Sequence, residues 1–336
     1  MSTEGGAKAI VAALIANLGI ALTKLLAWLL TGSSSMLAES IHSLADSGNQ
    51  LLLLLGGRRA KKAATAQHPF GYGRERYIWA FIVSIVLFSV GGLFALYEGY
   101  HKLHHPEAIE SWKWVPVAVL LVAIVLESYS FMTAFRETNK SRGSSSLLTF
   151  IRRAKAPELP VVLLEDTAAL LGLVFALFGV SLTLLTDNGI WDGIGTLAIG
   201  ILLVLVAIFL AVETKSLLLG EGANAEDVEK IERAIVSDGD TVERIIHMKT
   251  LYLGPDELLV AAKIAVHHDD TAAKVADAID KAESRIRTAV PVARVIYLEP
   301  DIYHSGKPRT PPVDETASAG ETSPAGEEDA THGAAH

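Results

Sequence analysis

Long apolar runs are the feature that most limits what this chain can fold into. They recur through its first two thirds, at residues 9–30, 36–57, 77–101, 114–135, 158–186 and 190–218. A helix of this length, rising about 1.5 Å per residue, crosses a hydrocarbon core of about 30 Å. Half of the 336 residues are hydrophobic, 20% are charged, and the mean hydropathy is +0.35. The sequence therefore predicts an α-helical membrane protein with six transmembrane helices, and it excludes a soluble enzyme of ordinary composition.

The last third of the chain follows a different pattern. After Gly220, helix-like and strand-like segments come in the order α-β-β-α-β, at residues 225–237, 245–254, 257–266, 271–290 and 293–300. This order predicts a small α+β domain over residues 220–303, behind a membrane domain over residues 1–219. Residues 304–336 are rich in Pro, Thr, Ala, Gly and Glu without periodicity, which predicts a disordered tail.

Charge is divided unevenly between the two parts. Residues 1–219 hold 17 basic and 15 acidic groups, whereas residues 220–336 hold 12 and 23, a net charge of −11. Without a basic face, nucleic acid is excluded as a partner. The chain has no cysteine, so any metal ligands must be His, Asp or Glu. We expect no resident cofactor.

Basic residues predict the orientation in the membrane lipid. The loops at residues 58–76 and 136–155 hold twelve Lys and Arg residues, whereas the opposite connections hold only Lys102 and Lys113. By the positive-inside rule, the basic loops and both termini face the cytoplasm. The opening MSTEGGAK has no basic or transit-like leader, which favours a multi-pass protein of a bacterial inner cell membrane.

Polar residues interrupt the second apolar run. At about 100° per residue six of them share one side of a helix: Glu39, His42, Ser43, Asp46, Asn49 and Gln50. An ionised group at the centre of a membrane helix costs roughly 2.5–3.5 kcal/mol on insertion scales. The stripe is therefore expected to face protein or water, and a bound cation is the simplest compensation. Lys24 lies at a depth comparable with Glu39, which predicts an ion pair between the first two helices.

His42 and Asp46 are one helical turn apart and can bind one ion together. An imidazole with a carboxylate suits Zn²⁺, with Mn²⁺, Fe²⁺, Co²⁺ or Ni²⁺ as alternatives, and suits Na⁺ or K⁺ poorly. A second acidic pair, Glu165 and Asp166, lies in the fifth run. Adjacent side chains diverge by about 100°, so only one of these carboxylates can point directly at the second helix.

These motifs carry a resemblance to a known family. The segment SSSMLAESIHSLADSGNQ, the basic loop HPFGYGRER, the acidic fifth helix and the α-β-β-α-β end resemble the cation diffusion facilitators over about residues 8–302. The resemblance implies six transmembrane helices, a cytoplasmic ferredoxin-like domain, and a homodimer that exchanges Zn²⁺ or a similar ion for protons. It implies a transport site at His42, Asp46 and Asp166. The segment LLEDTAALLG resembles the branch that includes the mitochondrial zinc carriers.

The chain departs from the family pattern at several positions. Val162 stands where a further His or Asp ligand is usual, and Glu165 is the candidate to replace it. In the C-terminal domain, His247 and Glu299 match family zinc ligands. Lys263 stands in place of a histidine there, so a complete binuclear site is not expected.

The leading interpretation is a secondary active transporter, not an enzyme. Protons and metal compete for the same lone pairs, because ligands must be deprotonated to coordinate, and rocking of helices alternates access to the site. A membrane di-iron enzyme is a weaker alternative, since the HxxHH cluster of His101, His104 and His105 is a single box. These histidines otherwise indicate a solvated helix end or a weak metal exit site. Val162 leaves open a non-transporting scaffold or heteromeric partner.

Overall fold

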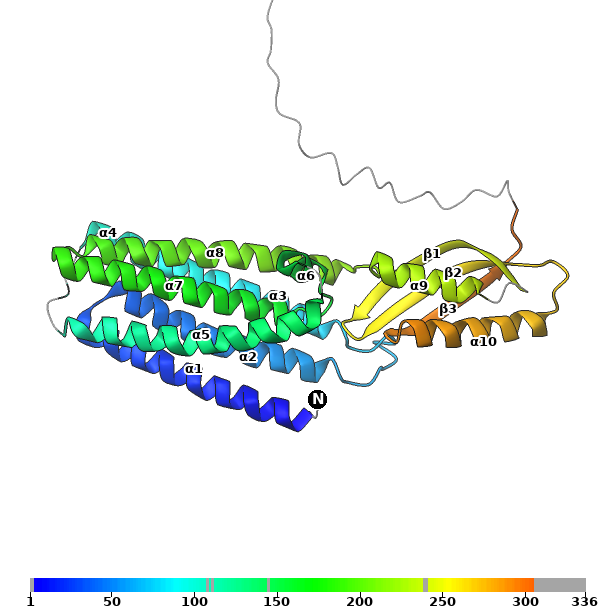
Figure 1. The fold of residues 1–336 in the computed structure, drawn as a ribbon, viewed down its shortest axis with the longest axis horizontal. Helices are drawn as coiled ribbons and strands as arrows, with labels where there is room; N and C mark the ends of the chain where they lie inside the picture. Colours follow the sequence, from blue (N-terminus) through cyan, green and yellow to red (C-terminus); the bar gives the residue numbers. More distant parts are fainter. Residues whose placement is uncertain (1–2, 107–108, 110–111, 144–145, 238–240, 305–336) are drawn as a thin grey trace, which may run out of the picture.

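The chain folds into a bundle of long helices followed by a small α/β region (Figure 1). The computed structural model describes residues 3–106, 109, 112–143, 146–237 and 241–304. The bundle consists of α1 (Thr3–Thr31), α2 (Ser34–Arg59), α3 (Glu75–Val86), η1 (Leu87–Leu93), α4 (Phe94–His104), α5 (Trp114–Arg142), α6 (Leu147–Arg153), α7 (Glu158–Thr186) and α8 (Ile190–Leu219). The α/β region consists of α9 (Ala225–Val236), β1 (Val242–Gly254), β2 (Glu257–Val266), α10 (Ala272–Ala289) and β3 (Ala293–Asp301).

Each predicted apolar run forms a helical segment of the bundle. Within the described residues, four stretches are long and apolar enough to cross a membrane: Glu75–His104, Trp114–Lys140, Glu158–Thr186 and Ile190–Leu219. In α1, residues Asn17–Thr31 form a shorter apolar helix, and α2 carries the polar stripe. A helical membrane region is therefore confirmed, while the number of six transmembrane helices stays a prediction.

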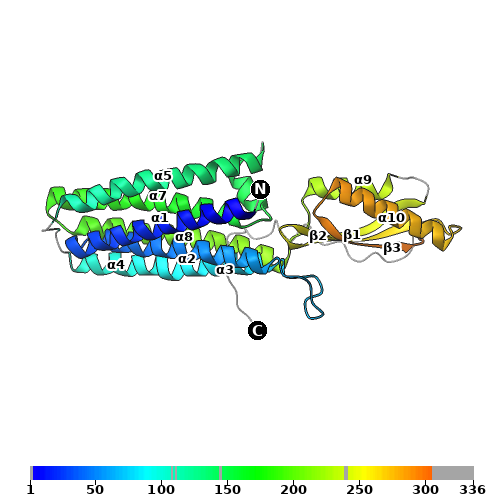
Figure 2. The ribbon, with the colours of Figure 1, turned by 90° about the horizontal axis from the view of Figure 1, so that it is seen from below.

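The surface of the bundle suits lipid. Large apolar side chains point outward from several helices, for example Leu29 at 63%, Val125 at 68% and Leu185 at 80% exposure. Polar side chains lie inside instead, which reverses the usual order of a water-soluble helix bundle. α5 runs with α7 along one side of the bundle and α3 with α4 along the opposite side (Figure 2). Between them, α2 contacts α1, α3, α7 and α8.

The third long segment is interrupted by a π-helical turn, η1, which joins α3 to α4. The sequence predicted one uniform helix over residues 77–101. A π turn adds a residue to the helical repeat, and here it brings Gly91 and Gly92 inward. A Cβ added at Gly92 would lie 2.7 Å from a methyl carbon of Val204 on α8. The glycine therefore permits close packing of this segment against α8.

The α/β region has the predicted α-β-β-α-β order. Its sheet has the order β1-β2-β3, in which β1 pairs with β2 in antiparallel fashion and β2 pairs with β3 in parallel. Helices α9 and α10 pack beside each other over the sheet (Figure 2), and Thr271 caps α10 by accepting a hydrogen bond from the Lys274 N–H. Apart from His304, the predicted disordered tail lies outside the described residues.

Candidate metal transport site

α2 carries most of the candidate site. Its polar stripe is buried by neighbouring helices, and the side chains of Glu39, His42 and Asn49 are at most 1% exposed. On the opposite side of the helix, Leu44 is 56% and Leu51 is 49% exposed. The prediction that the stripe faces protein and not lipid is confirmed.

The start of α2 is held by Asp192 of α8. The buried Asp192 carboxylate accepts hydrogen bonds from the backbone N–H of Ser34 at 2.7 Å and from the hydroxyls of Ser33 and Ser34 at 3.0 and 3.1 Å. A carboxylate is stabilised at this point because the first N–H groups of a helix lack hydrogen-bond partners and the helix dipole is positive at this end. Asp192 thereby fixes the position of α2 along the bundle.

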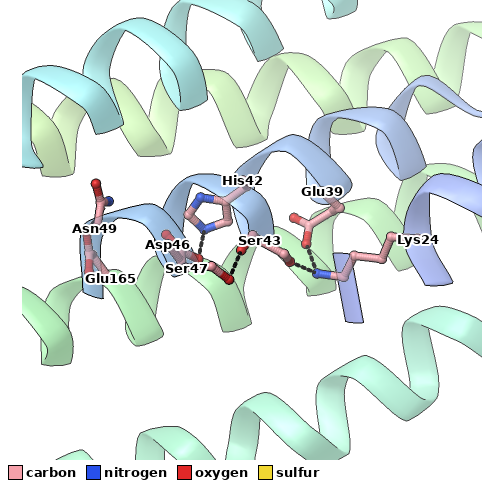
Figure 3. Close-up of polar contacts among 8 residues, drawn as sticks. All are labelled: Lys24, Glu39, His42, Ser43, Asp46, Ser47, Asn49 and Glu165. Atoms are coloured by element: carbon pink, nitrogen blue, oxygen red, sulfur yellow. Dashed lines mark hydrogen bonds and ion pairs between the residues drawn. The ribbon is translucent and has the colours of Figure 1, made fainter. Parts of the chain in front are cut away.

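His42 and Asp46 lie side by side on α2, as predicted from their spacing (Figure 3). The His42 Nε2 and Asp46 Oδ2 atoms are 3.5 Å apart, too far for a strong hydrogen bond. Both ring nitrogens of His42, Asp46 Oδ1 and Asn49 Oδ1 are buried without a hydrogen-bond partner in the described part of the chain. Leaving a buried polar atom unpaired costs about 1–3 kcal/mol. A bound cation could be coordinated by these unpaired nitrogen and oxygen atoms, which would remove this cost.

The two adjacent carboxylates on α7 accept hydrogen bonds from two different neighbouring helices. The Asn49 amide of α2 donates a hydrogen bond to Glu165 Oε1 at 2.7 Å (Figure 3). The Ser130 hydroxyl of α5 donates to Asp166 Oδ2 at 3.1 Å. The prediction that only one carboxylate points at the second helix agrees with this geometry, and that carboxylate is Glu165.

A buried ion pair lies one turn from His42, as the sequence predicted. The Lys24 ammonium of α1 contacts Glu39 Oε2 at 2.9 Å and donates to the Ser43 hydroxyl at 2.8 Å (Figure 3). The Lys24 side chain is fully buried. Gly172 of α7 makes room for the pair, since a Cβ there would lie 2.7 Å from Glu39 Oε1.

α5 adds a buried carboxylate that the sequence analysis missed. Glu127 is 7% exposed and lies three residues before Ser130, on the same face of the helix. Its charge acts on both Asp46 and Asp166. A single acidic residue in the otherwise apolar run at 114–135 was the signal available for finding it.

The predicted ligands do not meet at one point in this structure. Among the residues it describes, no group of three or more His, Asp or Glu side chains is close enough to hold a metal ion. His42 and Asp46 form one pair on α2, and Glu165 and Asp166 form another on α7, with each pair within electrostatic reach of the other. A complete coordination shell requires the two helices to bring these pairs together.

A cavity of about 1470 Å³ connects this region with the α/β region. It lies between α2, α5, α7, the α2–α3 loop and the sheet, and it reaches Gln50, Val162 and Asp166 at its inner end. Val162 and Asp166 are one turn apart on α7 and face the same space. The cavity therefore extends from the sheet of the α/β region to Asp166 inside the bundle.

In the α/β region, a lysine stands where the family pattern has a metal ligand. Lys263 lies in register between His247 of β1 and Glu299 of β3. Its ammonium contacts Glu299 at 2.8 Å and Asp301 at 3.4 Å. The hydrogen bond to Glu299 raises the pKa of Lys263, so the lysine stays charged and neutralises the carboxylates there.

The chain is similar in sequence to known membrane proteins. The model of the cation efflux transmembrane domain matches residues 10–219. The proton-coupled zinc antiporter SLC30A9, mitochondrial, of Xenopus laevis is 34% identical over 266 residues, which cover 79% of this chain and 47% of that protein. Its Homo sapiens counterpart is 33% identical, covering 78% and 46%. Metal tolerance protein C4 of Arabidopsis thaliana is 29% identical, covering 76% and 56%.

The chain therefore belongs to the cation efflux family, whose members are also called cation diffusion facilitators. It spans about half the length of the first curated relatives it matches. Family membership confirms the predicted class, a membrane transport protein and not an enzyme. The di-iron enzyme alternative was wrong.

Proposed function

We propose that this chain performs efflux of a divalent cation, moving it away from the side of the α/β region and across a membrane in exchange for protons. Zn²⁺ is the first candidate cargo, with Mn²⁺, Fe²⁺, Co²⁺ and Ni²⁺ as others, because imidazole and carboxylate ligands suit borderline divalent ions. Two of the relatives are named proton-coupled zinc antiporters, and a third is named a metal tolerance protein. The ion would be held between α2 and α7 by His42, Asp46, Glu165 and Asp166.

One observation carries this proposal. His42 and Asp46 are buried, adjacent and short of hydrogen-bond partners at the polar side of α2. A purely structural pair would satisfy its own hydrogen bonds. Unsatisfied ligand atoms opposite two further carboxylates on α7 favour a site built for an exchangeable ion.

The same atoms supply the coupling to protons. A metal ion binds only the deprotonated carboxylates and the neutral imidazole, so cation and protons exclude each other from the site. Exchange then needs access from alternate sides. The cavity that reaches Asp166 supports access from the side of the α/β region, and rocking of α2 against α7 would close this route and open the other.

Six transmembrane helices fit this mechanism. α1 and α2 pack along the bundle with the four apolar segments, and six crossings leave both termini on one side. The basic loops favour the cytoplasm for that side and a cell membrane as the location. We assign transport to residues 1–219 and a cytoplasmic domain of ferredoxin-like fold to residues 220–303. The family resemblance supports a homodimer.

Reconstitution in lipid vesicles tests the proposal. Vesicles containing the chain and a zinc-sensitive dye should show zinc flux that depends on an imposed proton gradient and disappears with a protonophore. His42→Ala and Asp46→Ala should each reduce this flux to background, because each removes a ligand from a shared site. His268→Ala is the matched control, since this histidine is 74% exposed in the α/β region. Undiminished zinc flux in both ligand variants would rule out the proposed site.

A scaffold or heteromeric partner is the second candidate, and Val162 favours it. This apolar side chain lines the cavity one turn before Asp166, where a further ligand is expected. Zinc binding by the purified chain separates the two functions. Binding that is lost in His42→Ala supports the transporter, whereas no binding at micromolar zinc supports the scaffold.

A further inference from the structure

Two histidines form an unassigned pair at the far end of α4. The rings of His101 and His105 are exposed, and their centres lie 5.0 Å apart. The backbone N–H of His105 donates to the His101 carbonyl at 3.0 Å, which fixes one helical turn between them. His105 is the residue just past α4 and has non-helical backbone angles, so the ring contact itself shows that the two side chains lie together.

The third histidine of the cluster is directed differently. His104 Nδ1 is hydrogen-bonded to the Tyr100 carbonyl of its own helix at 2.9 Å, and the His104 ring lies against the Tyr100 ring, with centres 4.2 Å apart. His104 therefore belongs to another face of α4. The cluster divides into one pair and one separate histidine.

We propose that His101 and His105 bind a divalent borderline cation such as Zn²⁺ as a two-imidazole site. Histidines four residues apart are a recurrent zinc-binding pair on helices, and here the contact of the two rings keeps the pair together although His105 lies just past α4. Two imidazoles on one tetrahedral zinc, with Zn–N bonds of about 2.0–2.1 Å, have ring centres about 5 Å apart, close to the observed separation. The two ring planes are inclined by 27°, so binding requires these exposed side chains to rotate until one nitrogen of each ring points at the ion. Water completes the coordination, so the site is weak.

The position of the pair gives it a role in release. α4 ends at the end of the bundle opposite the α/β region (Figure 1). If the chain moves cations away from the α/β side, as proposed above, His101 and His105 lie on the exit side. A weak site there would receive an ion without retaining it. This role rests on the proposed function, whereas metal binding by the pair does not.

Footprinting of histidines tests the binding site directly. The full chain in detergent is treated with diethyl pyrocarbonate, with and without Zn²⁺, and modification of each histidine is measured by mass spectrometry. Zinc at nine-tenths occupancy should slow the modification of His101 and His105 by about tenfold. His104 is the internal control, and its rate should stay unchanged. Equal rates at His101 and His105 with and without zinc, or equal protection of His104, would overturn the proposal.

A second measurement separates this site from the transport site. In a His42→Ala/Asp46→Ala background, zinc protection of His101 and His105 should persist, and adding His101→Ala should abolish it at His105. Adding His104→Ala should leave it intact. If zinc no longer protects His101 and His105 in the His42→Ala/Asp46→Ala variant, the proposal of an independent site is overturned. Failure of transport in the wild type, with protection retained, would overturn only the proposed function.

Discussion

At the scale of single residues, the directions of two adjacent carboxylates could not be derived from sequence. The 100° divergence of Glu165 and Asp166 follows from helix geometry, but the rotation of α7 decides which one meets α2. The structure turns Glu165 toward Asn49 and Asp166 toward Ser130. The ion pair of Lys24 and Glu39 was predictable, because the two opposite charges lie at similar depth in consecutive membrane segments.

Asn49 orients a candidate ligand and can be tested alone. Its amide donates to Glu165 Oε1 at 2.7 Å, so Asn49→Ala should leave Glu165 free to turn away and should weaken zinc binding roughly 10- to 100-fold. Ser47→Ala is the control, because the Ser47 hydroxyl donates a hydrogen bond to the Ser43 carbonyl of its own helix. Equilibrium zinc binding by the purified chain measures both. Equal affinities in the two variants would contradict a role for Asn49.

Lys263 stands where the family resemblance implies a histidine ligand, and its replacement by histidine should create a zinc site. Lys263→His would add an imidazole between His247 and Glu299, a ligand set suited to zinc. In the His42→Ala/Asp46→Ala background, we expect this variant to bind one additional zinc equivalent. Lys249→His is the control, because Lys249 is exposed on β1. This variant should bind no additional zinc with comparable affinity. Titration of zinc against a competing chelator measures the number of zinc ions bound. If Lys263→His binds no additional zinc, residue 263 is not placed to form a zinc site with His247 and Glu299.

At the scale of helices, length and hydropathy suffice to locate α1, α2, the continuous segment of α3, η1 and α4, and α5, α7 and α8, with ends that differ from the six predicted runs by at most seven residues. They did not predict η1 or α6. The π turn depends on packing of Gly92 against α8, and α6 is a seven-residue helix too short to show periodicity. Glu127 was also overlooked, although it follows the same rule that identified Lys24.

The pair of Lys24 and Glu39 ties α1 to α2 inside the bundle. Lys24→Met should destabilise the chain by about 3–5 kcal/mol, because it leaves a buried carboxylate without its counter-ion. Lys24→Met/Glu39→Gln removes both charges and should recover most of this loss. Thermal unfolding in detergent measures the difference. A single variant as stable as the wild type would show that the carboxylate has other compensation.

At the scale of the whole molecule, the bundle and the α/β region meet through the α2–α3 loop. A Cβ on Gly254 would lie 2.8 Å from the Gly73 Cα. Beside this contact, Arg76 pairs both with Glu158 at the start of α7 and with Asp256 of the β1–β2 turn. The helix that carries Glu165 is thus linked through one guanidinium to the sheet. No sequence pattern indicated this link, because its members are distant in the chain.

Gly254→Ala tests the contact between the two parts. The added methyl meets backbone that cannot rotate away, so we expect a loss of about 1–3 kcal/mol and faster proteolysis near residues 220–224. Gly48→Ala is the control, since nothing lies within 4 Å of a Cβ there. Limited proteolysis with thermal unfolding reports both effects. Unchanged cleavage in Gly254→Ala would mean that the two parts do not depend on this approach.

The π turn gives the third membrane segment a mechanical property that a uniform helix lacks. A π turn is held by longer-range, less regular hydrogen bonding than the α-helices on either side. We therefore expect η1 to bend more easily than α3 or α4. α3, η1 and α4 all pack on α8, and α3 also contacts β1 of the sheet. We expect any change in tilt between α3 and α4 to occur at residues 87–93, because the hydrogen bonding of the segment is least regular there.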